Sequence, residues 1–500
     1  MVYGFSPFGS RGSLVRVDVD VRHGFPGTDL VGLANTEVRE SRERVRAAIR
    51  NSGFQFPAER VLISLSPAAV PKVGAGLDLA IAVALLQATG QVELPTPLLA
   101  VGELAISGAV APVRGSMAGA VAALEGGVPS LLLATSAALR VEPWLEAAKV
   151  YALESLKQLR TLDSARLDRT DPTRVMLPSG PVQTLSFDDL HGQALLKWAA
   201  AVAAAGCHHT LLTGPPGSGK TMTARRLSGL MPQLARRDAL QVARVHSMRS
   251  LVTDHRYPPL RAPHHGASTE GMLGGGKAIV PGEASLAHRG VLLLDEAPEF
   301  KPHVLQALRE PIETGRIVVT RAGFVEVFPA RFTLVLTSNL CPCGKLGRPD
   351  DSCMCSRHEI ERYWRRVGDA LLDRIDIRVR TTYERDPDRH GGPSHNGLVE
   401  QVAAARARMA QRNAAAGGRP NGLLTPSEVA ELLPLSGESR SALVEAARSF
   451  ALSDRATARI ATVAWTIADL TDKPRPDRSD IMEAAGFRVA GPWTHGRAGT

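Results

Sequence analysis

The feature that most constrains the fold is a glycine-rich octapeptide, Gly214-Pro215-Pro216-Gly217-Ser218-Gly219-Lys220-Thr221. It fits the pattern G-x-x-x-x-G-K-[ST], in which backbone N–H groups wrap phosphate groups and the lysine reaches the terminal ones. A short apolar run, 208–212, precedes it and a helical pattern follows it, which is the strand, loop, helix order of a nucleotide-binding unit. We therefore expect an α/β domain that binds ATP and Mg²⁺, with the Thr221 hydroxyl as a magnesium ligand. The alternative, a glycine-rich turn without a ligand, is disfavoured by these flanking patterns.

Two acidic residues follow a later apolar run. Val291–Leu294 leads directly into Asp295 and Glu296, which suits one carboxylate for the water shell of the magnesium ion and one to activate the attacking water. Asn339 follows the strand-like run 332–337, and we expect it to hydrogen-bond the γ-phosphate or that water. An asparagine in an ordinary turn after a strand is the alternative. The set predicts that ATP is hydrolysed.

Arginines downstream of this set are candidates for contacts with phosphate. Arg374 stands where a strand begins, and a neighbour in a ring of subunits could present it to the charge that develops on the γ-phosphate. Pairing with Asp373 or Asp376 is the structural alternative. Arg455, at the start of a helical pattern, is expected to contact the nucleotide of its own chain, with Arg459 one turn later as the alternative.

The chain has 500 residues, too many for one hydrophobic core, so several domains are expected. An alternating run at Val15–Val21 predicts a half-buried strand near the start, and the segment Thr425–Glu428 predicts a capped helix near the end. The patterns divide the chain into an α/β domain at 1–155, a linker at 156–184, the ATP-binding core with a parallel sheet at 185–383, a hinge loop at 384–397, a helical lid at 398–490 and a flexible tail at 491–500.

The charge balance points to a polyanionic partner. A formal charge of +9 and a pI near 9.6 favour nucleic acid, although such a bias also occurs without any binding role. The arginine-rich helical pattern at Thr36–Arg50 predicts either a solvated surface helix or a nucleic-acid contact. Residues 1–13 lack the apolar segment of a secretory signal. No apolar run approaches the ~20 residues of a membrane span, so we expect a cytoplasmic protein with no membrane contact.

Four of the five cysteines cluster in the sequence, at Cys341, Cys343, Cys353 and Cys355. Two C-x-C pairs on one short loop favour a structural zinc site with four thiolate ligands. Unliganded thiols and a disulfide remain as alternatives. Cys207 lies in an apolar, alanine-rich run and is expected to be a buried core thiol.

Several longer motifs extend over almost the whole chain. They are Arg261-Ala262-Pro263-His264-His265, Gly274-Gly275-Gly276, Pro281-Gly282-Glu283, Asp295-Glu296, Cys341-Pro342-Cys343-Gly344, Leu371-Leu372-Asp373-Arg374 and Thr466-Ile467-Ala468-Asp469-Leu470. Together they resemble the ComM/YifB family of magnesium-chelatase-like AAA+ proteins. The resemblance implies a ring, expected to be hexameric, that uses ATP to drive branch migration of recombining DNA during natural transformation. A magnesium-chelatase-type remodeller with partner subunits is one alternative, and a scaffold that uses ATP only as a switch is another.

Two insertions are candidates for DNA contact. The segment 251–290 is rich in glycine, and the segment 316–330 predicts a β-hairpin with Arg316 and Arg321 near its tip. In rings that this family resembles, such loops point into the pore. Basic side chains around a channel suit a phosphate backbone, so Lys277 and Arg321 are predicted DNA contacts. Ordinary surface hairpins are the alternative.

The amino-terminal domain resembles the Lon protease domain fold, through the segments 72–76, 102–104 and 108–115. The resemblance places Gly74 where Lon carries its catalytic serine, and Met117 near the position of the catalytic lysine. Without an activated hydroxyl no such proteolysis can occur. We expect a noncatalytic platform for assembly or for DNA.

Overall fold

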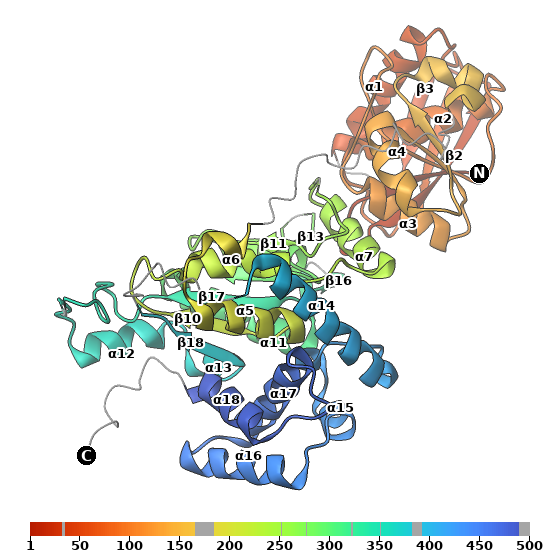
Figure 1. The fold of residues 1–500 in the computed structure, drawn as a ribbon. Coiled ribbons are helices and arrows are strands. Elements are labelled where there is room, and N and C mark those ends of the chain that lie inside the picture. The colour runs from red at the N-terminus through yellow and green to blue at the C-terminus, as the bar shows by residue number, and fades with distance from the viewer. Residues whose placement is uncertain are drawn as a thin grey trace.

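The structure, a computed structural model, describes residues 1–32, 36–165, 185–251, 253–276, 278–321, 324–350, 352–382 and 393–489. An amino-terminal α/β domain, a central α/β core and a carboxyl-terminal helical domain follow one another along the chain (Figure 1). The predicted fold class is therefore confirmed. Most of the predicted linker, most of the predicted hinge and the predicted tail lie outside the described residues.

The amino-terminal domain is built on a seven-stranded mixed sheet in the order β3-β4-β2-β1-β5-β8-β9. The alternating run at Val15–Val21 lies in β2, where Val15 and Val17 are buried, as a sheet with one covered face requires. The strands are β1 (Val2–Ser6), β2 (Ser13–Arg22), β3 (Gly27–Val31), β4 (Arg60–Ser66), β5 (Leu98–Val101), β8 (Ser130–Ala134) and β9 (Lys149–Leu153), with a separate short pair, β6 (Glu103–Leu104) and β7 (Val110–Ala111).

Helices cover this sheet, and the arginine-rich pattern forms one of them, α1. Arg44 on α1 donates two hydrogen bonds to the fully buried carboxylate of Asp78, at 3.0 and 3.2 Å. Arg44 is therefore paired with a buried carboxylate of its own domain, and its guanidinium serves this ion pair instead of a nucleic-acid contact. The helices are α1 (Thr36–Asn51), η1 (Ala75–Leu77), α2 (Asp78–Ala88), α3 (Ser116–Glu125), α4 (Thr135–Val141), η2 (Glu142–Trp144) and η3 (Leu156–Ala165).

The boundary of this domain differs from the prediction. The segment at 156–165 forms η3, and its Leu156, Leu159 and Leu162 are buried in the same core as the sheet. The prediction that the linker begins at residue 156 is therefore wrong. Proline and charge in the segment 156–184 suggested a connector, but three leucines at helical spacing were enough to bind its first turns to the domain.

The central core contains a five-stranded sheet in the order β11-β14-β17-β10-β18, and every neighbouring pair is parallel. Strands β14 and β17 are buried along their whole length, as is usual where helices cover both faces of a parallel sheet. The strands are β10 (Thr210–Thr213), β11 (Leu260–Arg261), β14 (Val291–Leu294), β17 (Thr333–Ser338) and β18 (Ile377–Arg380). The helices of the core are η5 (Phe187–Asp189), α5 (Ala194–Gly206), α6 (Lys220–Leu230), η6 (Ala297–Glu299), α10 (Pro302–Ala307), α11 (Arg309–Thr314), α12 (Arg357–Arg365) and α13 (Asp369–Leu372).

Two insertions extend from the core, as predicted, and one of them is the expected hairpin. Its strands pair antiparallel, so Arg321 lies beside the turn while Arg316, opposite Pro329, lies at the base. The prediction that Arg316 is near the tip is therefore wrong. The elements of the two insertions are α8 (Thr269–Leu273), β12 (Gly274–Gly275), β13 (Val280–Pro281), α9 (Glu283–Leu286), β15 (Arg316–Arg321) and β16 (Phe324–Pro329), and helix α7 (Arg236–Ser247) precedes the first of them.

The amino-terminal domain contacts the core through this hairpin. The Glu326 carboxylate on β16 accepts hydrogen bonds from the backbone N–H and the hydroxyl of Ser10, at 2.8 and 2.9 Å. Beside them the rings of Phe8 and Phe324 meet edge to face, with centroids 5.0 Å apart. Helix α7, next to the amino-terminal domain in Figure 1, adds a second contact, because the backbone N–H of Gly115 donates to Ser247 at 2.7 Å.

The carboxyl-terminal domain is helical, as predicted, and packs below the core in Figure 1. The predicted capping box is present, with Thr425 and Glu428 bonded to one another's backbone N–H groups and Pro426 at the first helical position. None of the helices in the described part of the chain combines the length and the apolar character that a membrane span requires. The helices are α14 (His395–Arg412), η7 (Ala414–Ala416), η8 (Asn421–Leu423), α15 (Pro426–Leu432), α16 (Gly437–Ser449), α17 (Asp454–Leu470) and α18 (Arg478–Val489).

Candidate nucleotide-binding site

The glycine-rich octapeptide forms the turn between β10 and α6. Helix α6 begins at Lys220, so its free backbone N–H groups open toward the turn. Gly219, at the N-cap, has a φ of 84°, in the left-handed region that only glycine adopts at little cost. At Gly214 a Cβ would lie 2.0 Å from the hydroxyl oxygen of Thr381 on the chain after β18, so no side chain fits there. The local conformation is that of a loop around an anion.

The Lys220 ammonium group lies within this loop. Its Nζ donates hydrogen bonds to the carbonyl oxygens of Gly214 and Pro215, at 2.8 and 2.7 Å. The residue is only 8% exposed, and burial lowers its pKa to about 8, although Asp295 and Glu296 oppose that shift. Among the described residues no carboxylate pairs with this buried ammonium, which suits an anionic ligand such as the terminal phosphates of ATP.

Asp295, at the end of β14, joins two neighbouring strands of the site. Its Oδ1 atom accepts hydrogen bonds from the hydroxyl of Thr221, at 2.9 Å, and from the hydroxyl of Thr337 at the end of β17, at 2.5 Å. A carboxylate and a hydroxyl in contact form the oxygen donor set that Mg²⁺ prefers. The residues present therefore fit a magnesium ion, with Thr221 and Asp295 as the groups that would hold it.

Glu296 follows with a strained backbone. Its φ is 55°, in the left-handed region, and its N–H donates to the Thr337 hydroxyl at 3.0 Å. Its side chain is exposed at the edge of the sheet where the phosphate loop also begins. Backbone strain of this kind concentrates at functional sites, and here it occurs at the residue predicted to activate the attacking water.

Asn339 lies at the same edge, directly after β17. Strands β10 and β17 are neighbours, and the Gly214 N–H donates to the Ser338 carbonyl at 3.2 Å. The structure therefore brings Asn339, the phosphate loop and the Asp295-Glu296 pair together, as the sequence predicts. Their roles in catalysis stay predictions.

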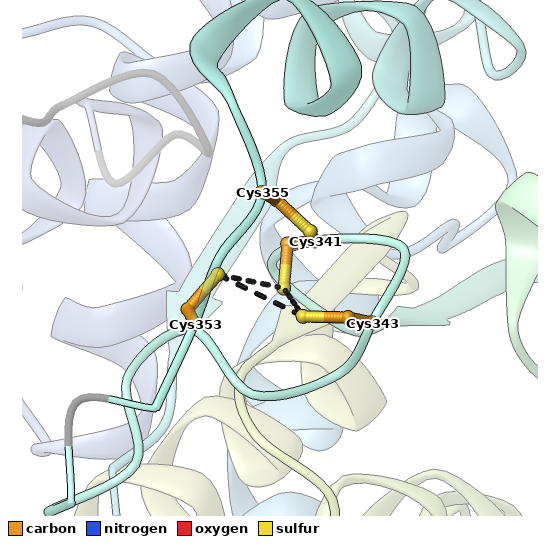
Figure 2. Close-up of side chains that lie close together, drawn as sticks. All are labelled: Cys341, Cys343, Cys353 and Cys355. Carbon is orange, nitrogen blue, oxygen red and sulfur yellow. Dashed lines mark hydrogen bonds between the residues drawn. The ribbon is translucent and has the colours of Figure 1, made fainter.

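The four clustered cysteines also come together, on the loop between β17 and α12 (Figure 2). The Sγ atom of Cys341 lies 3.3 Å from that of Cys343 and 3.6 Å from that of Cys353, and all four sulfurs lie within 4.8 Å of one another. Sulfurs at 2.3 Å from a tetrahedral zinc ion would be about 3.8 Å apart. All five cysteines are free thiols, so the disulfide alternative is not what the structure contains. Cys207 is buried, as predicted.

Arg374 and Arg455 share one carboxylate. Glu313 on α11 lies 2.7 Å from the guanidinium of Arg374 and 2.8 Å from that of Arg455. The Arg374 side chain is 11% exposed, and Glu313, instead of the adjacent aspartates, is its partner among the described residues. Arg459 pairs with Asp376 at 3.4 Å. Burial alone would raise the pKa of Asp376, but Arg459 and His208 outweigh it and hold that pKa well below its usual range.

This arginine cluster lies at the opposite edge of the sheet from the phosphate loop. The backbone N–H of Asp376 donates to the carbonyl of His209, directly before β10, whereas the loop follows Thr213 at the other end of β10. Four residues of strand, on the order of 13 Å, separate the two edges. The prediction that Arg455 contacts the nucleotide of its own chain is therefore corrected, and Arg459 fails for the same reason.

The predicted DNA contacts and the Lon-like positions can be located in part. Arg321 is half exposed beside the hairpin turn, 4.0 Å from Glu270, while Lys277 lies outside the described residues. Gly74 adopts a φ of 80°, and Met117 is buried in α3. Neither residue carries a hydroxyl or an amine, and the noncatalytic role of the domain stays a prediction. The Lys72 ammonium is buried and bonded to the carbonyl of a nearby proline.

Sequence reasoning missed three residues of these clusters. Thr337 holds Asp295, Thr381 backs the phosphate loop through its contact with the Ser218 hydroxyl at 2.5 Å, and Glu313 holds two arginines. Thr337 carried a usable signal, because a hydroxyl at the end of an apolar parallel strand reaches the same edge as the loop. Glu313 carried none, since its partners are 61 and 142 residues away in sequence.

Comparison with known proteins gives consistent matches. Residues 186–388 match the family described as magnesium chelatase, subunit ChlI; residues 17–137 match subunit ChlI of Mg-chelatase; and residues 393–488 match its C-terminal part. An uncharacterized protein of Mycobacterium tuberculosis is 37% identical over 97% of both chains. The uncharacterized protein YifB of Escherichia coli is 35% identical over 98% of this chain and 97% of its own. The competence protein ComM of Haemophilus influenzae is 34% identical, with the same coverage.

The lowered pKa of Lys220 makes nucleotide affinity depend on pH. Only the ammonium form attracts phosphate, so above about pH 8 binding must first restore a proton, and the dissociation constant of ATP should rise up to tenfold per pH unit. Calorimetric titration from pH 7 to 9.5, in two buffers that differ in ionisation heat, measures both the affinity and the proton uptake. Lys220→Arg keeps its charge over this range and should give a flat profile. An equal slope in that variant would mean that another group titrates.

Proposed function

Because the chain belongs to the ComM/YifB family of magnesium-chelatase-like AAA+ proteins, we propose that it is an ATP-driven DNA motor that moves branched recombination intermediates during natural transformation. The family suggests an ATPase, and the proposal adds the substrate and the work. A relative named as a competence protein supports the choice of DNA. The match to chelatase subunits keeps a magnesium-chelatase-type remodeller as the second candidate.

The observation that carries the proposal is the set of groups at one edge of the sheet. Lys220 grips the terminal phosphates, Asp295 orders the water shell of the metal ion, and Glu296 accepts the proton of the attacking water. Asn339 orients that water or the γ-phosphate. Bound Mg²⁺ would neutralise charge on the phosphate oxygens. A scaffold that used ATP only as a switch would not need Glu296, so the set favours hydrolysis.

The arginine cluster supports a ring in which subunits complete one another's sites. Four guanidinium groups, those of Arg374, Arg455, Arg459 and Arg488, pair with the three carboxylates of Glu313, Asp373 and Asp376. A fifth, that of Arg378, donates to the carbonyl of Leu372. The excess of positive charge suits the phosphates of a neighbour's nucleotide. We propose that Arg374 is the catalytic finger of this contact and that Arg455 acts with it, in trans, within a hexamer.

The hairpin β15–β16 supports the choice of DNA. Arg321 is half exposed beside its turn and has only a distant carboxylate partner, and the chain as a whole is basic. A cation at the end of a projecting ribbon contacts a phosphate backbone without reading bases. Lys277, on the neighbouring insertion, is proposed to do the same.

Stimulation by DNA is the first test. Branched DNA should raise the rate of ATP hydrolysis, and the stimulation should fall as salt rises because phosphate contacts release counterions. Glu296→Gln should bind ATP and hydrolyse it at least a hundredfold more slowly. Arg321→Ala should weaken the stimulation, whereas Arg478→Ala, a control with the same 49% side-chain exposure, should not. A turnover rate that ignores DNA, with an active enzyme, would favour the chelatase-type remodeller.

Mixing two inactive variants tests the ring contact. Lys220→Ala and Arg374→Ala should each lose on the order of a thousandfold in turnover, and a mixed ring should recover part of it where an intact loop meets an intact finger. Arg455→Ala should be rescued by Lys220→Ala in the same way, because its side chain belongs to the same cluster. If Lys220→Ala rescued Arg374→Ala but not Arg455→Ala, Arg455 would have a role in its own chain. If no mixture recovers while the chains demonstrably co-assemble, the finger assignment fails.

For the cysteines we propose a structural zinc site with four thiolate ligands. Freshly reduced protein should contain about one zinc per chain, measured by metal analysis after gel filtration. Cys341→Ser should release the metal, while Cys207→Ser, a change at the cysteine outside the cluster, should retain it. Zinc-free wild-type protein would leave unliganded thiols as the interpretation.

A further inference from the structure

The cluster of cysteines lies directly against the nucleotide site. We call residues 341–350 and 352–355 the cysteine knuckle, which begins two residues after Asn339 and ends where α12 begins. Its Gly344 has a φ of 72°, and a Cβ there would lie 3.3 Å from Pro216 Cγ and 3.8 Å from Asn339 Nδ2. At Gly347 a Cβ would lie 3.8 Å from Pro215 Cδ. The backbone of the knuckle therefore touches both the phosphate loop and Asn339.

Helix α12 fixes the other end of the knuckle to the same strand. The indole N–H of Trp364 donates to the carbonyl of Leu340 at 3.2 Å, and the Ser338 hydroxyl lies 3.5 Å from the Tyr363 hydroxyl. These contacts hold the residues on both sides of Asn339. The position of Asn339 thus depends on the conformation of the loop that connects β17 to α12.

The four sulfurs join the two halves of the knuckle. In its described part the knuckle contains neither helix nor strand, Cys343 is exposed, and Met354 is 93% exposed. The N–H of Leu346 donates to Cys341 Sγ at 3.3 Å, a contact that suits a thiolate. A loop without a core of its own gains its shape from a crosslink or a bound metal, and the sulfurs are arranged for a metal.

We propose that zinc in the cysteine knuckle is a positioning element of the ATPase site. It holds Asn339 and the Pro215-Pro216 turn in place, so that the full rate of hydrolysis requires the metal. The inference rests on the proposed ATP hydrolysis, in which Asn339 orients the attacking water or the γ-phosphate. Zinc takes no part in the chemistry, because four thiolates leave it no open position. Its loss should lower the rate of hydrolysis more than the affinity for ATP, since Lys220 and the loop amides remain.

The test uses the full-length chain and four proteins: wild type, Cys353→Ser, Asn339→Ala and the double variant. Cys353→Ser should lose its zinc and reduce kcat about ten- to a hundredfold, the usual effect of removing a group that orients a catalytic residue. Asn339→Ala should keep its zinc and reduce kcat at least as much. In the double variant the two losses should not multiply, because both act through Asn339. The dissociation constant of ATP should change by less than about threefold throughout.

Two further variants keep the test decisive if Cys353→Ser fails to fold. Gly344→Ala keeps all four sulfurs and should keep its zinc. Its Cβ would lie 3.3 Å from Pro216 Cγ and the alanine would have to adopt a φ of 72°, so the contact between the knuckle and the phosphate loop should shift and kcat should fall. Gly417→Ala, at a glycine with a similar φ of 71° and open space around it, is the matched control and should leave both zinc and kcat unchanged. Thermal melting establishes that each variant is folded.

Three results would overturn the inference: reduced wild-type protein without zinc, loss of zinc with kcat unchanged, or losses in Cys353→Ser and Asn339→Ala that multiply. Failure of the proposed motor is seen separately, as hydrolysis that does not respond to DNA, and leaves these comparisons intact. If the wild type does not hydrolyse ATP at all, hydrogen exchange tests whether zinc holds Asn339 in place. Chelation of zinc must then raise the exchange of the Ser338–Leu340 amides, and unchanged protection would overturn it.

Discussion

The site depends on one property of parallel strands, which is that their carboxyl ends meet at the same edge of the sheet. Strands β14, β17 and β10 are neighbours. The phosphate loop, the Asp295-Glu296 pair and Asn339 therefore converge, although Gly214 and Asn339 are 125 residues apart in the sequence. Asp295 fixes this convergence, because one of its oxygens accepts a hydrogen bond from each adjoining element, through Thr221 and Thr337. Without that shared acceptor the three strand ends would still lie close together, but no hydrogen bond to Asp295 would fix the positions of their polar groups.

The same property separates the arginines from the phosphates of their own chain. Arg374 and Arg455 stand at the amino ends of the strands, where Glu313 balances part of their charge. Burial alone would raise the pKa of Glu313, but these arginines lower it, so the carboxylate stays ionised. A charged group that is mostly buried and cannot reach its own nucleotide gains most from an anion delivered by another subunit. The ring that we propose would meet this need, because head-to-tail contacts bring one edge of a sheet to the opposite edge of the next.

Local patterns in the sequence predicted the parts of the site that short segments encode. The octapeptide, the carboxylates after an apolar run and the paired C-x-C motifs each combine residue type with spacing, and the structure brings the members of each motif together. Long-range partners were not predictable in this way. Glu313 is an unremarkable glutamate on a short helix until two distant arginines reach it, and the cis contact expected of Arg455 failed because helical spacing says nothing about which edge of the sheet a helix approaches. The prediction that the linker begins at residue 156 failed although the signal was local. The leucine pattern there was overlooked because prolines follow it in the same segment.

Contacts between the amino-terminal domain and the hairpin decide which motions the nucleotide cycle can produce. Glu326 accepts two hydrogen bonds from Ser10, and Phe8 packs against Phe324, so one face of β15–β16 is bound to that domain while Val318, Val325 and Val327 face outward. Hydrogen bonds to a charged acceptor contribute about 1.5–3 kcal/mol each, and separating the surfaces would also expose two aromatic rings to water. If the hairpin moved without the amino-terminal domain, both the hydrogen bonds and the aromatic packing would be lost. Movement of the hairpin together with the amino-terminal domain would preserve both contacts.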